Sequence, residues 1–176
     1  MVSLNAKSFL KDKAYLVVKV DSNEFTLSIN QIHGIGEFNN EFQEELESGF
    51  YLGNFHLHAR IIPVINLKKY LNCPNSDFVL TIQSRILFIS STKETILSSK
   101  TMIVGLGVDA ILGFYRYKTS GKEIKSEGNL SSEANCFRMN SYIEINSKIY
   151  PLLNLKKLLD FSQLEKLLED YLPEKI

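Results

Sequence analysis

One segment of the chain occurs twice, and this repeat constrains the fold more than any other feature. Residues 59–72 read ARIIPVINLKKYLN and residues 147–160 read SKIYPLLNLKKLLD, so seven of the fourteen positions are identical. A weaker likeness links residues 27–35 (LSINQIHGI) to residues 106–114 (LGVDAILGF). A repeat of this length, with its parts in the same order, indicates two similar folded units rather than a solenoid of short repeats.

Each copy of the longer segment predicts a strand followed by a short helix. The proline, Pro63 or Pro151, has no N–H group, so we expect it at a strand edge or a bulge. The asparagine, Asn66 or Asn154, is suited to cap a helix by accepting a backbone N–H. The leucines after it lie four residues apart and face inward, which leaves the Lys-Lys pair of each copy in solvent.

Apolar and β-branched runs on either side of polar segments predict two hairpins. The first joins residues 15–20 (YLVVKV) to residues 25–29 (FTLSI) through an Asp-Ser-Asn turn. The second joins residues 85–89 (RILFI) to residues 102–108 (MIVGLGV) through the polar segment 90–99. Helical patterns are fewer and shorter, so the sequence predicts a mainly β chain.

Two segments do carry a helical pattern. Residues 38–50 are acidic and have apolar residues at every fourth position, which indicates a short amphipathic helix. Residues 162–172 carry an apolar stripe that ends before Pro173, which predicts a C-terminal helix. Between the predicted strands, the polar segment 116–135 indicates an exposed loop.

The length of 176 residues allows one domain, or two small units that are tightly fused. The repeat predicts one subdomain at about residues 12–72, a second at about 84–160 and a C-terminal helix over 161–176. Units of about 70–80 residues bury a low fraction of their surface when alone. We therefore expect the two subdomains to share one core within a single domain.

Composition excludes several classes of function. Twenty basic residues balance twenty acidic ones, which argues against a general nucleic-acid binder because such a protein needs a cationic surplus. The chain has neither the apolar run of a transmembrane helix nor the apolar core of a signal peptide. Its two cysteines, Cys73 and Cys136, form no CxxC motif, so we expect a reduced, cytoplasmic protein.

No nucleotide-binding, hydrolase or metalloprotease motif occurs in the chain, so we expect neither an enzyme nor a cofactor. The histidines are the one constellation to weigh. His56 and His58 would share a face of a strand, and if His33 came near them, three imidazoles could hold a metal with an open position. The alternative is that all three are ordinary polar residues. We favour this alternative because no carboxylate or thiolate stands at ligand spacing from them.

Four blocks of the sequence occur in the order and at the spacing that are typical of one known family. The blocks are YLVVKVDSNEFTLSINQIHGI, GNFHLHARIIPVINLKKYL, VGLGVDAI and YPLLNLKKLL. In these blocks the chain resembles CheW, the adaptor of bacterial chemotaxis arrays, over residues 15–160. The second block is similar to the family's Gly, then N-L-R-G, then I-P-V-x-x-L, and the third is similar to V-G-x-x-V-D-x-V.

The resemblance implies two intertwined five-stranded SH3-like β-barrels that share a hydrophobic core. It implies a non-enzymatic scaffold, cytoplasmic and peripheral to membrane receptor arrays, without a metal or a cofactor. One surface would bind the regulatory domain of the histidine kinase CheA, which has the same fold and pairs through barrel ends. A groove between the barrels would bind the cytoplasmic helical tip of methyl-accepting chemoreceptors. Neither membrane insertion nor nucleic-acid binding is implied.

Three positions depart from the family's pattern, and one of them is Ser48, where a Pro is expected before Phe50. His58 stands where the family usually has Arg, and Gly34 stands where it usually has Glu. Because Glu and Arg are thought to act together, their joint loss indicates an altered receptor or kinase partner. The chain could then be a CheW-like module of another histidine-kinase pathway, or a ring component that competes with the usual adaptor. The residues that the resemblance places at protein-binding surfaces are Ile32, Gly34, Gly53, His58, Gly105, Val108, Asp109 and Phe114.

For Gly105, Val108 and Asp109 a purely structural role is an equally good interpretation, because a bulged strand and its turn would also require such residues. The sequence leaves this choice open.

Overall fold

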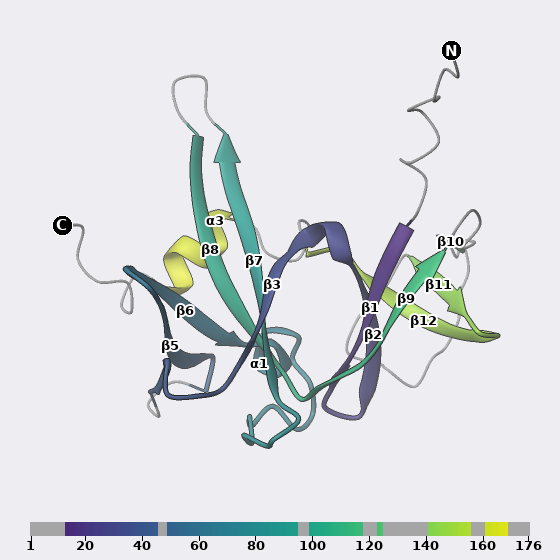
Figure 1. Cartoon of the computed structure of the whole chain (residues 1–176), viewed down its shortest axis with the longest axis horizontal. Helices are drawn as coiled ribbons and strands as arrows, with labels where there is room; N and C mark the ends of the chain where they lie inside the picture. The colour runs from purple at the N-terminus through teal and green to yellow at the C-terminus, as the bar shows by residue number, and fades with distance from the viewer. Residues whose placement is uncertain are drawn as a thin grey trace, which may run out of the picture.

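The computed structural model describes residues 13–45, 49–94, 99–117, 123–124, 141–155 and 161–168. These residues form two six-stranded sheets and a few short helices (Figure 1), so the predicted mainly β fold is confirmed. In chain order the elements are β1 (Lys13–Val20), β2 (Asn23–Ser28), η2 (Ile29–Gln31), β3 (Ile32–Glu37), β4 (Phe42–Glu44), β5 (Tyr51–Leu57), β6 (Arg60–Asn66), α1 (Leu67–Tyr70), β7 (Arg85–Glu94), β8 (Ser99–Val108), β9 (Ala110–Tyr117), β10 (Glu123–Ile124), β11 (Tyr142–Ile145), β12 (Lys148–Leu153) and α3 (Phe161–Leu167).

The two sheets exchange hairpins. One sheet has the strand order β10-β11-β12-β2-β1-β9 and is called here the β1 sheet; the other, the β3 sheet, has the order β3-β7-β8-β6-β5-β4. The early hairpin β1–β2 therefore lies among late strands, and the late hairpin β7–β8 lies among early ones. This is the intertwining that the resemblance implied. Each sheet has six strands rather than five, because the short strands β4 and β10 add to an edge.

The longer repeat occupies equivalent places in the two sheets. In the first copy, β6 pairs in parallel with β8 from Val64 onward. In the second copy, β12 pairs in parallel with β2 from Leu152 onward. Pro63 and Pro151 each stand immediately before the first of these residues, where the strand does not yet have its parallel neighbour. A residue without a backbone donor is tolerated at such a place.

The weaker repeat forms the outer strands β3 and β9. The pairing of β3 with β7 steps from Ile32 to Gly34 and leaves out His33. The pairing of β9 with β1 steps in the same way from Ile111 to Gly113 and leaves out Leu112. Both edge strands therefore bulge at the same position of the repeat. A bulge bends the edge of a sheet and redirects the side chains beyond it.

Three hydrophobic clusters hold the sheets together. The largest contains buried side chains from strands of both sheets and from α1 and α3, which confirms the predicted shared core. Along β1, Leu16 and Val18 enter this shared core, whereas Tyr15 and Val17 point to a cluster that belongs to the β1 sheet alone. The alternation arises from the two-residue period of a strand. The β3 sheet has its own cluster, which is formed by Phe55, Ile62, Val64, Ile86 and Phe88.

The C-terminal helix is confirmed in its described part. α3 (Phe161–Leu167) packs against β7, and both Leu164 and Leu168 are completely buried in the shared core. The remainder of the predicted helix lies outside the described residues, as does most of the predicted loop 116–135.

The helix that residues 38–50 predict is wrong over the described part of that segment. Phe42 begins the strand β4 and stands opposite Phe55 of β5. Its ring packs edge-on against Phe38, with the ring centroids 4.8 Å apart. Pairing with a neighbouring strand thus overrides the local period of apolar residues, because intrinsic helical preference is weak against tertiary contacts.

The second hairpin is longer than its apolar runs. The ladder between β7 and β8 continues through the polar segment as far as the pair Glu94 and Ser99. Backbone hydrogen bonds form between polar residues as readily as between apolar ones, so the ladder extends beyond the apolar residues.

Candidate protein-binding surfaces

The eight predicted residues divide into a surface group and an interior group. Gly34 and Ile32 are half-buried on β3, His58 is exposed in the turn between β5 and β6, and Phe114 is exposed on β9. The interior group holds the buried residues Gly53, Gly105 and Val108, together with the largely covered Asp109.

The surface of β3 is shaped directly by its bulge. Ile32 packs against the shared core, whereas Ile35 is 50% exposed beyond the bulge. A Cβ atom at Gly34 would lie 3.6 Å from Cδ2 of Phe88, which is ordinary van der Waals contact. This position therefore has room for a side chain, and the backbone there does not require glycine. The bulged His33 is held by a contact of 2.7 Å between its Nε2 and Oγ of Ser90.

His58 occupies a tight turn at the tip of the β5–β6 hairpin. Because Leu57 pairs with Arg60, only His58 and Ala59 form the turn. The φ angle of His58 is 53°, in the left-handed region that turns of this kind use. The imidazole is exposed, and the nearby hairpin residues Leu57 and Ile61 also expose apolar side chains.

Gly53 shapes the same hairpin from inside. Its φ is 139°, and a Cβ atom there would lie 2.0 Å from the backbone oxygen of Gln43. No other residue fits without moving the neighbouring strand β4. The register between β5 and β6 also shifts between Tyr51 and Gly53, which marks a bulge.

Gly105 and Val108 are packing residues of β8. A Cβ atom at Gly105 would lie 2.7 Å from Cγ2 of Ile86, so the neighbouring strand β7 leaves no space for a side chain. Val108 is completely buried in the shared core. Both positions therefore have a packing role in the structure.

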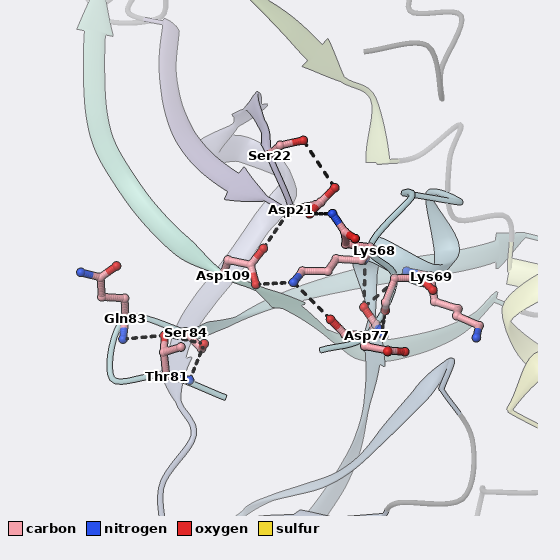
Figure 2. A network of polar contacts seen from close by, with 12 residues as sticks. Asp21, Ser22, Lys68, Lys69, Asp77, Thr81, Gln83, Ser84 and Asp109 are labelled. Carbon is pink, nitrogen blue, oxygen red and sulfur yellow. Dashed lines mark hydrogen bonds and ion pairs between the residues drawn. The ribbon is translucent and has the colours of Figure 1, made fainter. Parts of the chain in front are cut away.

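Asp109 is the single residue between β8 and β9, and both its backbone N–H and its carboxylate have bonding partners; Figure 2 shows those of the carboxylate. Its N–H donates to the backbone oxygen of Lys19 over 3.0 Å. Its Oδ2 accepts the backbone N–H of Asp21 at 2.6 Å, and its Oδ1 forms an ion pair of 2.8 Å with Nζ of Lys68. Asp109 is therefore part of the frame behind the surface.

The burial of Lys68 corrects a prediction. The Lys-Lys pair of the first copy was expected in solvent, and Lys69 is exposed, but the side chain of Lys68 is only 9% exposed. Besides Asp109, its Nζ reaches the backbone oxygen of Asp77 at 3.3 Å and lies over the ring of Phe78. Asp109 comes from a distant part of the chain, and Asp77 and Phe78 come from the loop after α1, so the helical pattern of the repeat carried no signal of them.

Exposed apolar side chains recur at matched positions of the repeats. Ile61 and Ile149 hold the same position of the longer repeat and are 46% and 48% exposed. Ile35 and Phe114 hold the same position of the weaker repeat and are 50% and 59% exposed. Each sheet thus shows one apolar side chain beside a hairpin tip and another on its outer strand. Sequence reasoning missed Ile61 and Ile149, although isoleucine is identical there in both copies.

The three histidines do not come together. His33 lies on β3 and His56 on β5, and the strands β7, β8 and β6 stand between them. Four strand spacings of about 4.8 Å make a path of roughly 20 Å when it is followed along the sheet. His58 lies in the turn and not on a strand face with His56. Over the described residues, no three His, Cys, Asp or Glu side chains are grouped to hold a metal.

The described part of the chain also contains no helix that is both long enough and apolar enough to cross a membrane.

Comparison with known proteins gives one family and one fold. A family model described as the CheW-like domain matches residues 14–163. Among solved structures, the crystal structure of the scaffolding protein TtCheW from Thermoanaerobacter tengcongensis aligns with a TM-score of 0.59 and 20% identity, covering 84% of this chain and 88% of that chain. At this identity the likeness shows a shared fold. No curated protein sequence matches the chain.

Proposed function

The chain belongs to the CheW-like domain family, and from this premise we propose that it is a non-enzymatic chemotaxis adaptor that couples chemoreceptors to a kinase. In this function it binds the cytoplasmic helical tip of methyl-accepting chemoreceptors and the regulatory domain of a CheA-type histidine kinase. It works in the cytoplasm, at the periphery of membrane receptor arrays, and needs no cofactor. The observation that carries the proposal is that Ile61 and Ile149, which hold the same position of the repeat in the two sheets, are both exposed.

An adaptor must hold two partners at once, and the duplicated surface suits this task. Ile61 lies in the β3 sheet and Ile149 in the β1 sheet, each about half exposed beside a hairpin tip. Half-exposed apolar side chains on rigid strands contribute strongly to binding because little conformational freedom is lost when they are covered. Since one copy stands in each sheet, two partners can be held without competing for one site.

The proposed receptor surface includes Ile32 and Gly34 on β3, His58 at the hairpin tip and Phe114 on β9. Gly53, Gly105, Val108 and Asp109 support this surface from inside, because the first three are buried and the fourth is bonded to the frame. Substitutions in this second group therefore affect binding through the shape of the protein.

The experiment that tests the adaptor function is co-sedimentation with receptor-containing membranes and a CheA-type kinase. Wild-type protein is expected to sediment with both, above an unrelated protein of the same size. Ile61→Glu and Ile149→Glu are each expected to lower the sedimented fraction about tenfold, because a charge replaces a contact residue. The matched control is Ile82→Glu, which changes an isoleucine that is 93% exposed on a loop without a repeat counterpart.

Two results would remove the proposal. One is wild-type protein that sediments no more than the unrelated protein. The other is that the Ile61→Glu and Ile149→Glu variants both sediment as well as the Ile82→Glu control.

A second candidate function rests on Gly34 and His58, which replace the usual Glu and Arg of the family. In this interpretation the protein occupies the adaptor's place in the ring and competes with the usual adaptor, or it serves another histidine-kinase pathway. Because the Glu and Arg act as a pair, His58→Arg alone is not expected to strengthen receptor binding. Gly34→Glu with His58→Arg is expected to strengthen it, since Gly34 has room for a side chain. Titrations of receptor tips with the single and double variants decide between the candidates, and tighter binding by the single variant would contradict the pairing.

A further inference from the structure

The chain passes between the two sheets at two places in its described part. It leaves the β1 sheet through η2, between β2 and β3, and returns through the single residue Asp109, between β8 and β9. Both crossings touch the helical end of a repeat copy. At the first, Oε1 of Gln31 accepts the N–H of Leu155 over 3.4 Å. At the second, Asp109 forms its ion pair with Lys68.

The two crossings are held with different strength. The first uses a long, neutral hydrogen bond, and η2 has neither a buried residue nor a side-chain cap at its start. The second uses a short bond between opposite charges, and the side chains of Lys68 and Asp109 are only 9% and 20% exposed. Charge-assisted hydrogen bonds are shorter and stronger than neutral ones, and they are weakened less by water when they are covered.

Asp109 and Lys68 connect elements of both sheets (Figure 2). Asp109 directly follows β8 of the β3 sheet, and it bonds to Lys19 and Asp21, at the end of β1 and in the turn after it, so it stands at the junction of the two sheets. Lys68 lies in α1, directly after β6 of the β3 sheet. The carboxylate of Asp109 therefore bridges the turn after β1 to α1, and a rotation of one sheet against the other would change the geometry of this bridge.

A stability argument alone does not account for such a pair. Replacing a buried ion pair by apolar side chains of similar size is often neutral or stabilising, because the charges must be taken out of water. What the pair offers beyond stability is a defined geometry. The charged Nζ has its best position where it meets Oδ1 of Asp109 and the backbone oxygen of Asp77 together.

We propose that the Lys68–Asp109 ion pair is a joint that fixes the angle between the two sheets and thereby couples the two partner-binding faces. Lys68 is a positioning residue that touches neither partner. The consequence for coupling rests on the proposed adaptor function, whereas the effect on the angle between the sheets does not.

The first experiment measures the joint without any partner. Spin labels are placed at Ile61→Cys and Ile149→Cys, one in each sheet, in a background where Cys73 and Cys136 are alanine. Pulsed electron spin resonance then gives the distribution of distances between the labels. Lys68→Met with Asp109→Asn removes both charges at nearly constant size, and we expect the distribution to shift or to widen. The matched control, Lys69→Met with Asp77→Asn, removes the same charges from neighbouring exposed positions and is expected to leave the distribution unchanged.

The outcomes of this experiment separate the alternatives. An unchanged distribution in the folded double variant overturns the proposal, and so does an equal change in the control. If the double variant fails to fold, Asp109→Asn alone is measured, because asparagine keeps the shape and an acceptor for the N–H of Asp21. That single variant must then shift or widen the distribution, and an unchanged distribution overturns the proposal.

The second experiment measures coupling with unlabelled protein. The affinity for the kinase regulatory domain is titrated with and without a saturating receptor tip, and the ratio of the two affinities is the coupling factor. In the Lys68→Met, Asp109→Asn variant this factor is expected to fall to about one, which means no coupling. If the variant keeps the coupling factor of the wild-type protein, the inference about coupling is wrong, while the proposed adaptor function stands. Wild-type protein that binds neither probe removes the proposed function, while the result on the joint stands.

Discussion

The two copies of the repeat carry the same Asn-Leu-Lys-Lys sequence and lie in different surroundings. Asn66 is buried: its Oδ1 accepts the N–H groups of Lys68 and Lys69, and its Nδ2 donates to the backbone oxygens of Gly49 and Ser76. Asn154, at the same position of the second copy, is exposed. The predicted helix cap is confirmed for Asn66, while the segment 156–160 of the second copy lies outside the described residues.

The difference arises from the segment that is next to each copy along the chain. After α1, the loop 73–84 folds back over the first copy and supplies the backbone oxygens of Ser76 and Asp77 to Asn66 and Lys68. The second copy is followed by α3, from which Leu164 enters the shared core, and by Leu168, which does the same. One motif thus serves as an anchor for a loop in one half and as a lead into a core helix in the other. Substitutions in the two halves can break or sharpen this contrast.

The largest effect is expected from Leu168→Asp, which disrupts the packing of the C-terminal helical segment that follows the second copy. Leu168 is completely buried, so the variant would place a carboxylate in the core without a partner and lower the free energy of unfolding by about 3–5 kcal/mol. Thermal unfolding measures the loss, with Lys166→Asp, an exposed position of the same helix, as the control. An unchanged melting temperature for Leu168→Asp would mean that α3 does not dock in solution.

A smaller but more selective effect is expected from Asn66→Ala compared with Asn154→Ala. The first variant removes the cap and leaves the backbone oxygens of Gly49 and Ser76 without this donor, at a cost of about 2–4 kcal/mol. The second variant changes an exposed side chain and is expected to cost less than about 1 kcal/mol. Urea unfolding of both variants gives the difference, and equal losses would erase the contrast between the copies.

A comparison of Gly53→Ala with Gly34→Ala distinguishes a buried position that supports the β3 sheet from a position at its surface. The alanine at Gly53 meets the backbone oxygen of Gln43 and a φ of 139°, so a loss of about 1–3 kcal/mol is expected. The alanine at Gly34 meets only an ordinary contact, and a change within about 1 kcal/mol is expected. Differential scanning calorimetry of the pair checks this order. A Gly53→Ala variant as stable as Gly34→Ala would show that β4 moves aside freely.

The smallest effect concerns Lys148, which holds the position of Arg60 in the other copy. The carboxylate of Glu24, 2.6 Å away, accepts from its Nζ and raises the pKa of Lys148 above its ordinary value of 10.5. A group whose pKa rises on folding stabilises the fold below the unfolded value and loses this contribution as the pH climbs past the folded one. Glu24→Gln is therefore expected to be slightly less stable than wild type at pH 7, and equally stable well above pH 10.5. A difference that persists in strong alkali would assign the effect to another cause.

The local sequence pattern was sufficient to predict several features of the fold. The first hairpin, the strand and capped helix of the first copy and the mainly β class all depend on residues that are close in sequence, where side-chain period and turn chemistry act directly. The duplication indicated a shared core because units of this size bury too little surface alone. The sequence alone therefore determined the class of fold and the family that the chain resembles.

Other features depended on contacts between distant residues, and only the tertiary structure decided them. Phe42 became part of a strand because Phe55 stands opposite it, against the helical period of its own segment. Lys68 became buried because Asp109 and the loop 73–84 meet at α1. His33 was separated from His56 by the order of strands in the sheet, which no spacing along the chain encodes. Periodicity reports which face of an element is apolar, whereas the partner that covers the face is set by how the whole chain packs.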